Sequence, residues 1–207
     1  MSKTISPDFF PQHPLLIVIS GMSGAGKDAV IKALKKRDLP LYYVITATSR
    51  DPRPGEVHGK DYFFYPPDEF QARIDRGEFA EHADVYGQLK GIPRSQIEGA
   101  LASGKDVVLK LDVQGAQTIR GLYPQAVLIN IFPPDEEEWL RHLRERNTEK
   151  PDELQERIDT SRQELEHIGV FDYFVINREG ALEQAVEDVV DIIKVEHLRV
   201  NPRTILQ

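Results

Sequence analysis

Apolar runs alternate with amphipathic segments along most of the chain. Five runs suit strands that are buried on both faces of a parallel sheet. They are residues 15–20, 41–46, 106–113, 126–132 and 173–177. Helical patterns lie between most of them, and strands that alternate with helices predict an α/β fold with a mostly parallel central sheet.

Apolar residues three or four positions apart predict the helices. After the first run these residues are Val30 and Leu34. In the charged segment 136–168 they are Leu154, Ile158, Leu165 and Ile168. In the last helix they are Leu182, Val186, Val189 and Ile193. We expect the stripe of the last helix to pack on the sheet.

Composition narrows the class of protein. The chain has 207 residues, which suits one domain of ordinary size. A net charge of −8 argues against broad binding to nucleic acid or to an anionic membrane surface. The absence of cysteine excludes disulfides and cysteine-bound zinc. Because the first residues carry no long apolar run, we expect a cytoplasmic enzyme.

The first apolar run leads into a glycine-rich stretch, GMSGAGKDAV at 21–30. Strand, glycine loop and helix follow in the order of a phosphate-binding loop, in which backbone N–H groups surround an anion at a helix N-terminus. This pattern predicts ATP binding by Gly21, Met22, Ser23, Gly24, Ala25, Gly26, Lys27 and Asp28. Lys27 would reach the β- and γ-phosphates. Asp28 departs from the pattern, because a Ser or Thr hydroxyl normally binds Mg²⁺ there.

A second informative stretch, TATSRDPRPGEVHGKDYFF at 46–64, lies in a segment (47–95) rich in Gly, Pro, Arg and aromatic residues. We expect this segment to form a separate small lobe. Arg50 and Arg53 flank a proline, and two guanidinium groups suit a phosphate monoester. Tyr62 would add a hydroxyl. On residue types alone, ordinary surface arginines explain the same spacing.

These stretches together resemble the guanylate kinase family. Its signature S-x-T-T-R-x-P-R-P-G-E-x-x-G-x-x-Y matches from Thr46 to Tyr62, and Thr46, Ala47 and Ser49 are small variations. The phosphate loop matches as well. The other matching stretches follow in order: EFAEHADVYG (78–87), LDVQGAQTIR (111–120), the helical segment with Arg146 and Arg157, and FDYFVIN (171–177). The likeness spans residues 14–195.

The resemblance implies a three-layer P-loop kinase with a central parallel sheet, a small mixed β lobe for the nucleoside monophosphate, and a helical lid. The core would comprise residues 14–45, 96–135 and 170–195, the GMP-binding lobe 46–95, and the lid 136–169. The implied reaction transfers the γ-phosphoryl group of ATP to GMP, with Mg²⁺ as the metal. ATP and GMP would be its small-molecule partners, without nucleic acid or membrane.

The resemblance also implies roles for single residues. Arg50, Arg53 and Tyr62 would hold the GMP phosphate. Thr46, Glu81 and Asp112 would contact guanine, whose N1–H and N2 amino group both donate to a carboxylate. Adenine offers no such donor pair, so Glu81 would reject AMP. Arg146 and Arg157 would join Lys27 around the transferring phosphoryl group, where positive charge is needed.

Four residues depart from the family pattern, and the lid motif differs at His142, Glu145 and Asn147. Asp28 replaces a hydroxyl, and Lys110 replaces a carboxylate near the metal. We expect Asp28 either to bind Mg²⁺ or to pair with Lys110, and the reciprocal exchange favours the pair. Lys90 replaces a tyrosine on the GMP phosphate and can neutralise it as a point charge. Ile92 replaces a hydroxyl residue and cannot donate to guanine O6, which would relax base selectivity.

Two other functions remain open. A related kinase of ribose 1,5-bisphosphate also carries G-K-D in its phosphate loop, although the arginines, Glu81 and Asp112 favour GMP. A non-catalytic, peptide-binding module of the same family is the second alternative. Such modules typically have damaged phosphate loops, whereas this chain keeps Gly21, Gly26 and Lys27.

Overall fold

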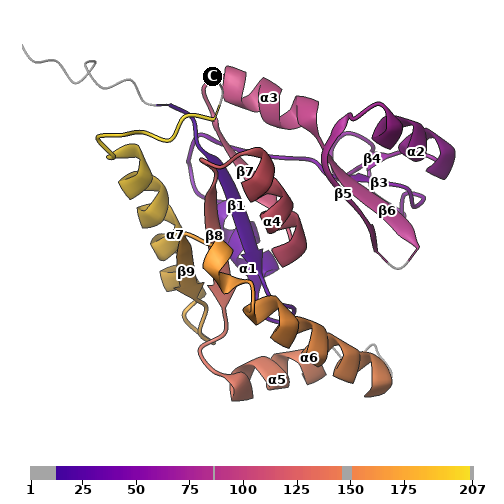
Figure 1. Ribbon diagram of the computed structural model, residues 1–207. Coiled ribbons are helices and arrows are strands. Elements are labelled where there is room, and N and C mark those ends of the chain that lie inside the picture. Colours follow the sequence, from indigo (N-terminus) through magenta and orange to yellow (C-terminus); the bar gives the residue numbers. More distant parts are fainter. Residues whose placement is uncertain (1–12, 86, 146–150, 206–207) are drawn as a thin grey trace, which may run out of the picture.

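A five-stranded parallel sheet forms the centre of the protein, with strand order β2-β7-β1-β8-β9 (Figure 1). The structure is a computed structural model that describes residues 13–85, 87–145 and 151–205. The strands are β1 (Leu16–Gly21), β2 (Leu41–Tyr43), β7 (Asp106–Lys110), β8 (Val127–Phe132) and β9 (Tyr173–Ile176). Each of the five apolar runs supplies one strand, so the expected α/β fold with a parallel sheet is confirmed.

Helices cover both faces of this sheet and complete three layers. Helices α1 (Lys27–Leu34) and α7 (Leu182–His197) pack on one face with Ile17 and Ile19 of β1. Helices α3 (Arg94–Ala102) and α4 (Val113–Leu122) pack on the other face, with Leu16 and Val18. Successive residues of a strand point to opposite faces, which explains why β1 is buried throughout. The apolar stripe of α7 packs on the sheet as expected, because its members are buried or partly buried there.

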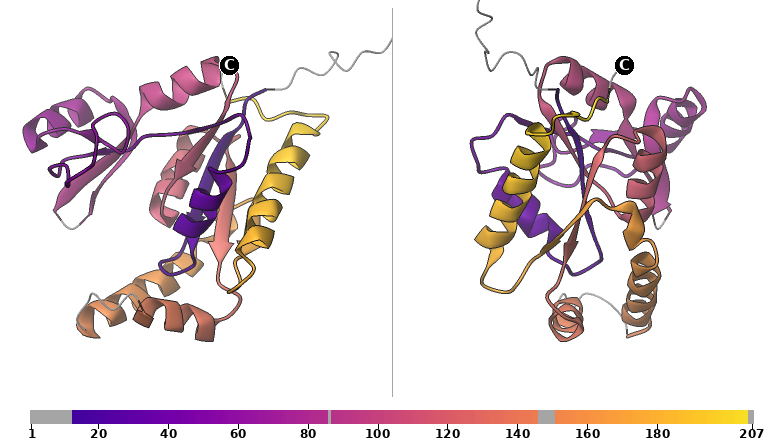
Figure 2. Two further views of the ribbon diagram at one scale, coloured as in Figure 1. Left: turned by 180° about the vertical axis from the view of Figure 1, so that it is seen from behind. Right: turned by 60° about the vertical axis from the view of Figure 1, so that its left-hand side comes forward.

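A smaller mixed sheet lies beside the central one and projects from it, as Figure 1 and the left view of Figure 2 show. Its order is β4-β3-β6-β5, with β3 (Ala47–Thr48), β4 (Phe63–Phe64), β5 (Phe79–Val85) and β6 (Gln88–Pro93). Helix α2 (Pro67–Asp75) covers it. Phe70 of α2 stacks on Phe79 with ring centroids 4.6 Å apart. The aromatic residues of this segment therefore form a small core of their own.

In its described residues, the charged segment near 136–168 forms three elements at one end of the central sheet (Figure 2). They are α5 (Glu136–Glu145), α6 (Pro151–Leu165) and the 3₁₀ turn η2 (Ile168–Val170). The single apolar stripe expected here is wrong in part. Ile158 is buried, but Leu165 and Ile168 are 40% and 44% exposed. Helix α6 ends at Leu165, so Ile168 lies beyond it in η2, and the side chain of Leu154 is outside the described part. In the described parts of the chain, no helix is long and apolar enough to cross a membrane.

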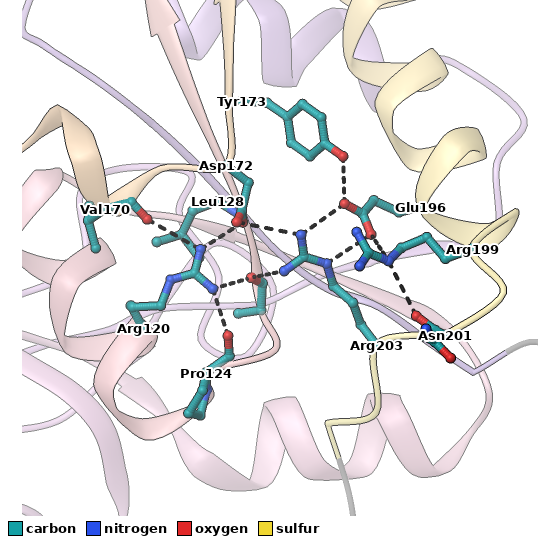
Figure 3. Close-up of polar contacts among 11 residues, drawn as sticks. Arg120, Pro124, Leu128, Val170, Asp172, Tyr173, Glu196, Arg199, Asn201 and Arg203 are labelled. Atoms are coloured by element: carbon teal, nitrogen blue, oxygen red, sulfur yellow. Dashed lines mark hydrogen bonds and ion pairs between the residues drawn. The ribbon is translucent and has the colours of Figure 1, made fainter.

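A polar network ties the C-terminal segment to the sheet (Figure 3). The side chain of Glu196, in α7, is fully buried. It accepts hydrogen bonds from the Tyr173 hydroxyl at 2.6 Å and from Arg203 Nε at 2.8 Å. Arg203 also lies 3.5 Å from Asp172, which accepts from Arg120 of α4 at 2.7 Å. The network therefore joins α4, β9, α7 and the last residues in one cluster.

The Arg203→Met variant is expected to lower the free energy of unfolding at pH 7 by about 3 kcal/mol, because it leaves a buried carboxylate without its cation. Burial alone would raise the pKa of Glu196, but hydrogen bonds from Arg203 and Tyr173 hold it below its ordinary value. This stabilisation is present above the ordinary pKa and is lost as the pH falls through the lowered one. Denaturant titration at several pH values measures both effects.

Arg199→Met is the matched control for this change. The Arg199 side chain is 47% exposed and its Nε lies 3.7 Å from the same carboxylate, so its loss should cost about 1 kcal/mol or less. Equal stability of the two variants would contradict the assignment of Arg203 as the partner that compensates the buried charge of Glu196.

Candidate active site

The glycine loop lies where β1 ends and α1 begins, and its backbone needs glycine at two positions. Gly24 and Gly26 have φ of 85° and 81°, in the left-handed region that favours glycine. A Cβ on Gly26 would lie 2.2 Å from Asn177 Nδ2, and one on Gly24 would lie 3.0 Å from Leu143 Cδ2. The loop is therefore a tight turn at a helix N-terminus, which is the arrangement that binds anions.

Lys27 connects this loop to the neighbouring strand. Its ammonium group donates to the carbonyl oxygens of Leu111, at 2.8 Å, and Gly21, at 3.3 Å. Burial lowers the pKa of Lys27, and the nearby Asp112 carboxylate offsets part of that shift. Lys27 is thus held at the carboxyl end of the sheet, where ligands bind in open α/β folds.

Asp28 and Lys110 form an ion pair, which confirms the pairing expected from their reciprocal exchange. Asp28 lies in the first turn of α1, and Lys110 is the last residue of β7. Their side chains are 63% and 52% exposed, so solvent screens the attraction. The pair places a carboxylate and an ammonium group together beside Lys27.

A cavity of about 400 Å³ lies between the small sheet and the central sheet. It is large enough for a small molecule. Lys27 lines it together with five residues expected to bind GMP, which are Thr46, Tyr62, Glu81, Lys90 and Asp112. Lys110 and the apolar Ile92 line it as well. The cavity therefore joins the glycine loop to side chains that are distant in sequence.

Glu81 is the carboxylate in this cavity with a strongly shifted pKa. Burial, with a smaller contribution from the Asp112 charge, raises the pKa of Glu81 to about 7. The Asp112 side chain caps α4 by accepting a hydrogen bond from the Gly115 backbone N–H at 2.8 Å. Glu81 therefore gains or loses its proton near neutral pH, and donors that approach it would favour the charged form.

The described residues that line the cavity do not include Arg50 and Arg53. Arg50 instead makes a two-pronged salt bridge to Glu56, with both N–O distances 2.7 Å. Hydrogen bonds from Arg50 and from the Arg53 backbone N–H lower the pKa of Glu56 to about 2. The Arg53 residue is exposed, and the Arg50 guanidinium lies 5.1 Å from the centre of the Tyr62 ring. Glu56 therefore engages the Arg50 guanidinium in this conformation, and the charge of Arg53 acts on the same carboxylate.

The two expected lid arginines are Arg146 and Arg157. Arg146 lies outside the described residues, and Arg157 belongs to α6 with its side chain outside the described part. Helix α6 nevertheless approaches the site through Glu164. Burial and the Asp112 charge raise the pKa of Glu164, while Lys27 acts in the opposite direction. Sequence reasoning missed Glu164, and its position in a charged helix gave no signal for it.

Two more side chains that sequence reasoning missed hold the glycine loop from outside. Trp139 of α5 donates from Nε1 to the Ser23 carbonyl at 2.7 Å. Asn177, which follows β9, donates from Nδ2 to the Ala25 carbonyl at 3.0 Å. A possible signal for Trp139 was its being the one tryptophan of the chain, within a strongly charged helix.

Comparisons with known proteins agree with one another. The family model described as guanylate kinase matches residues 13–196. Guanylate kinase 2, chloroplastic/mitochondrial, of Oryza sativa subsp. japonica is 46% identical over 205 residues, covering 99% of this chain and 71% of that protein. The guanylate kinase of Nitrosomonas europaea is 43% identical over 184 residues, covering 89% and 90%. The crystal structure of guanylate kinase from Anaplasma phagocytophilum matches with a TM-score of 0.73 and 26% identity, over 92% of this chain and 90% of that one.

Proposed function

The chain belongs to the guanylate kinase family, and from this premise we propose how its own residues serve the reaction. The chain is an enzyme that transfers the γ-phosphoryl group of ATP to GMP, giving ADP and GDP. The observation that carries the proposed roles is the cavity that Lys27 and Glu81 share. It offers a cation for the transferred phosphoryl group and a carboxylate for the base.

For ATP we propose the loop from Gly21 to Asp28. Its backbone N–H groups and the N-terminal end of α1 would surround the phosphates, and Lys27 would contact the β- and γ-phosphates. The hydrogen bonds of Lys27 to two carbonyl oxygens support this role, because they hold the ammonium group beside the loop without neutralising it.

For Mg²⁺ we propose Asp28 as a ligand, because its donor chemistry fits. Mg²⁺ prefers oxygen ligands and is usually held by one or two carboxylates together with substrate phosphates and water. Asp28 offers an exposed carboxylate at the end of the loop, although Lys110 competes for it. When bound, the metal would neutralise charge on the phosphates of ATP.

For GMP we propose that Glu81 accepts from guanine N1–H and N2, with Thr46 and Asp112 on the same base. Lys90 and Tyr62 would face the phosphate, since both line the cavity. Arg50 and Arg53 would complete the phosphate site. In that role Glu56 orients the Arg50 guanidinium, which keeps N–H donors beyond those used by Glu56.

For the conformational cycle we propose three parts within residues 14–195. The core, residues 14–45, 96–135 and 170–195, would bind ATP. Residues 46–95 would carry GMP toward it, and residues 136–169 would close as a lid. Arg146 and Arg157 of that lid would add positive charge around the phosphoryl group in the transition state. Catalysis of phosphoryl transfer rests mainly on positioning and electrostatic stabilisation, without a covalent step on the protein.

An acceptor panel tests the substrate. ADP production should be measured with GMP, dGMP, AMP and ribose 1,5-bisphosphate, each with and without Mg²⁺. We expect GMP to be the best acceptor and AMP to be poor, because adenine leaves the Glu81 carboxylate unpaired. Ile92 cannot donate a hydrogen bond to guanine O6, and the loss of such a bond costs about 1–3 kcal/mol in a buried polar site. We therefore expect the enzyme to discriminate less strongly between purine bases than it would with a hydrogen-bond donor at position 92. Activity with ribose 1,5-bisphosphate alone would defeat the proposal, and failure to bind ATP would favour a binding module.

A further inference from the structure

The glycine loop accepts hydrogen bonds from two side-chain donors that belong to other elements. Trp139 Nε1 lies 2.7 Å from the Ser23 carbonyl oxygen, and Asn177 Nδ2 lies 3.0 Å from the Ala25 carbonyl oxygen. Both donors come from elements far away in the sequence, α5 and the segment after β9. The two contacts fix alternate peptide units of the loop.

A fixed carbonyl also fixes the next N–H group, because the two lie in one rigid peptide plane and point in opposite directions. Because Trp139 fixes the direction of the Ser23 carbonyl, it also fixes the Gly24 N–H, which points to the side of the peptide away from Trp139. The Asn177 contact does the same for the Gly26 N–H. Among the described residues, neither of these N–H groups donates to a protein acceptor. Both are available for an anion in the loop.

Packing makes Trp139 a rigid support. Its residue is 3% exposed, and Leu143, one turn later in α5, is 5% exposed. Both belong to the core cluster that contains Met22 and Ala25 of the loop. A Cβ at Gly24 would lie 3.0 Å from Leu143 Cδ2, so Leu143 packs directly against the loop at this position. The indole ring therefore has a fixed position, and its hydrogen bond is directed at one carbonyl.

We propose that Trp139 is a positioning residue for ATP, which sets the Ser23–Gly24 peptide so that the Gly24 N–H faces the phosphates. This inference rests on the proposed binding of ATP by the loop. Because Trp139 belongs to α5, at the start of the proposed lid, it also couples the position of that helix to the geometry of the loop. Movement of α5 would alter ATP affinity directly.

The Trp139→Phe variant tests the role, since phenylalanine keeps an aromatic ring in the core and removes the N–H donor. Calorimetry should give roughly a five- to tenfold weaker Kd for ATP, the factor that one hydrogen bond contributes. The KM for ATP should rise in parallel, while the KM for GMP stays unchanged. Val186→Ala is the matched control, because it removes buried volume from the same core cluster but lies in α7, outside both the loop and the proposed lid. It should change stability but neither substrate constant.

The wild-type protein supplies a second measurement that does not depend on a variant. Trp139 is the one tryptophan in the chain, so its fluorescence reports this contact. Addition of ATP should shift the emission, and addition of GMP alone should leave it unchanged. An unchanged Kd for ATP in Trp139→Phe, or equal losses for both substrates, would overturn the inference while leaving the proposed function intact. Absence of ATP binding by the wild-type protein would instead defeat both.

Discussion

The Glu81→Gln variant is expected to lower kcat/KM for GMP by roughly 10²- to 10⁴-fold. A carboxylate accepts hydrogen bonds from both guanine N1–H and N2, and bonds to a charged group contribute about 1.5–3 kcal/mol each. Glutamine offers one acceptor and turns its own N–H₂ donor toward the other guanine donor. Activity with AMP should not fall, because adenine has no donor pair for the lost carboxylate. Steady-state kinetics with both acceptors measures the difference.

We also expect Glu81 to make the KM for GMP depend on pH. The pKa of Glu81 is raised to about 7, chiefly by burial, and GMP needs the charged form. The KM for GMP should therefore fall as the pH rises through 7, and below that value it should increase about tenfold per pH unit. The GMP phosphate itself ionises near a pKa of about 6, but it does so equally in every variant. The part of the pH dependence of the KM for GMP that disappears in Glu81→Gln is therefore due to Glu81.

Asp84→Asn is the matched control, because Asp84 is an exposed acid on the same strand and does not line the cavity. It should change neither the KM for GMP nor its pH dependence. A Glu81→Gln enzyme with unaltered GMP kinetics would exclude the carboxylate from base recognition.

The central fold could be predicted from the sequence because its strands are buried on both faces. A strand such as β1, buried at every position, needs an unbroken apolar run, and that run is visible without a structure. The stripe of α7 is equally visible, because α7 packs one face on the sheet. The helical segment before β9 was harder. Its apolar spacing continues past Leu165, where the α-helix ends, so the pattern alone did not locate the boundary.

The geometry of the glycine loop and the position of Lys27 beside it could be predicted, because strand, glycine loop and helix follow in a fixed order. The site was not predictable where side chains act on one another. The salt bridge of Arg50 with Glu56 depends on the path of a loop, and the sequence contains many carboxylates that could have competed. The contact of Trp139 with Ser23 joins residues 116 positions apart, and only the packing of α5 brings them together. The pairing of Asp28 with Lys110 could be predicted, because both residues depart from the family pattern and carry opposite charges.

The Lys110→Asp variant, which breaks this pair, is expected to have the second large effect. The change would place two carboxylates beside the phosphates of ATP, and each like-charge pair about 4 Å apart costs roughly 4 kcal/mol at an effective dielectric of 20. We expect kcat/KM for ATP to fall by roughly 10²- to 10³-fold, allowing for solvent at this exposed site. Asp28→Ser alone should cost less, because it removes negative charge and leaves the Lys110 cation in place.

The double variant, Asp28→Ser with Lys110→Asp, separates coupling from independent damage. If the residues act as a pair, the double variant should lose less activity than Lys110→Asp alone, since it restores a hydroxyl beside a carboxylate. Calorimetry without Mg²⁺ gives a readout independent of turnover: Asp28→Ser should bind ATP more tightly than the wild type, and Lys110→Asp more weakly. Asp191→Ser with Lys194→Asp is the matched control, because that ion pair in α7 is similarly exposed, at 66% and 61%. Additive losses in the active-site cycle would mean that Asp28 and Lys110 contribute to ATP binding separately, despite their contact.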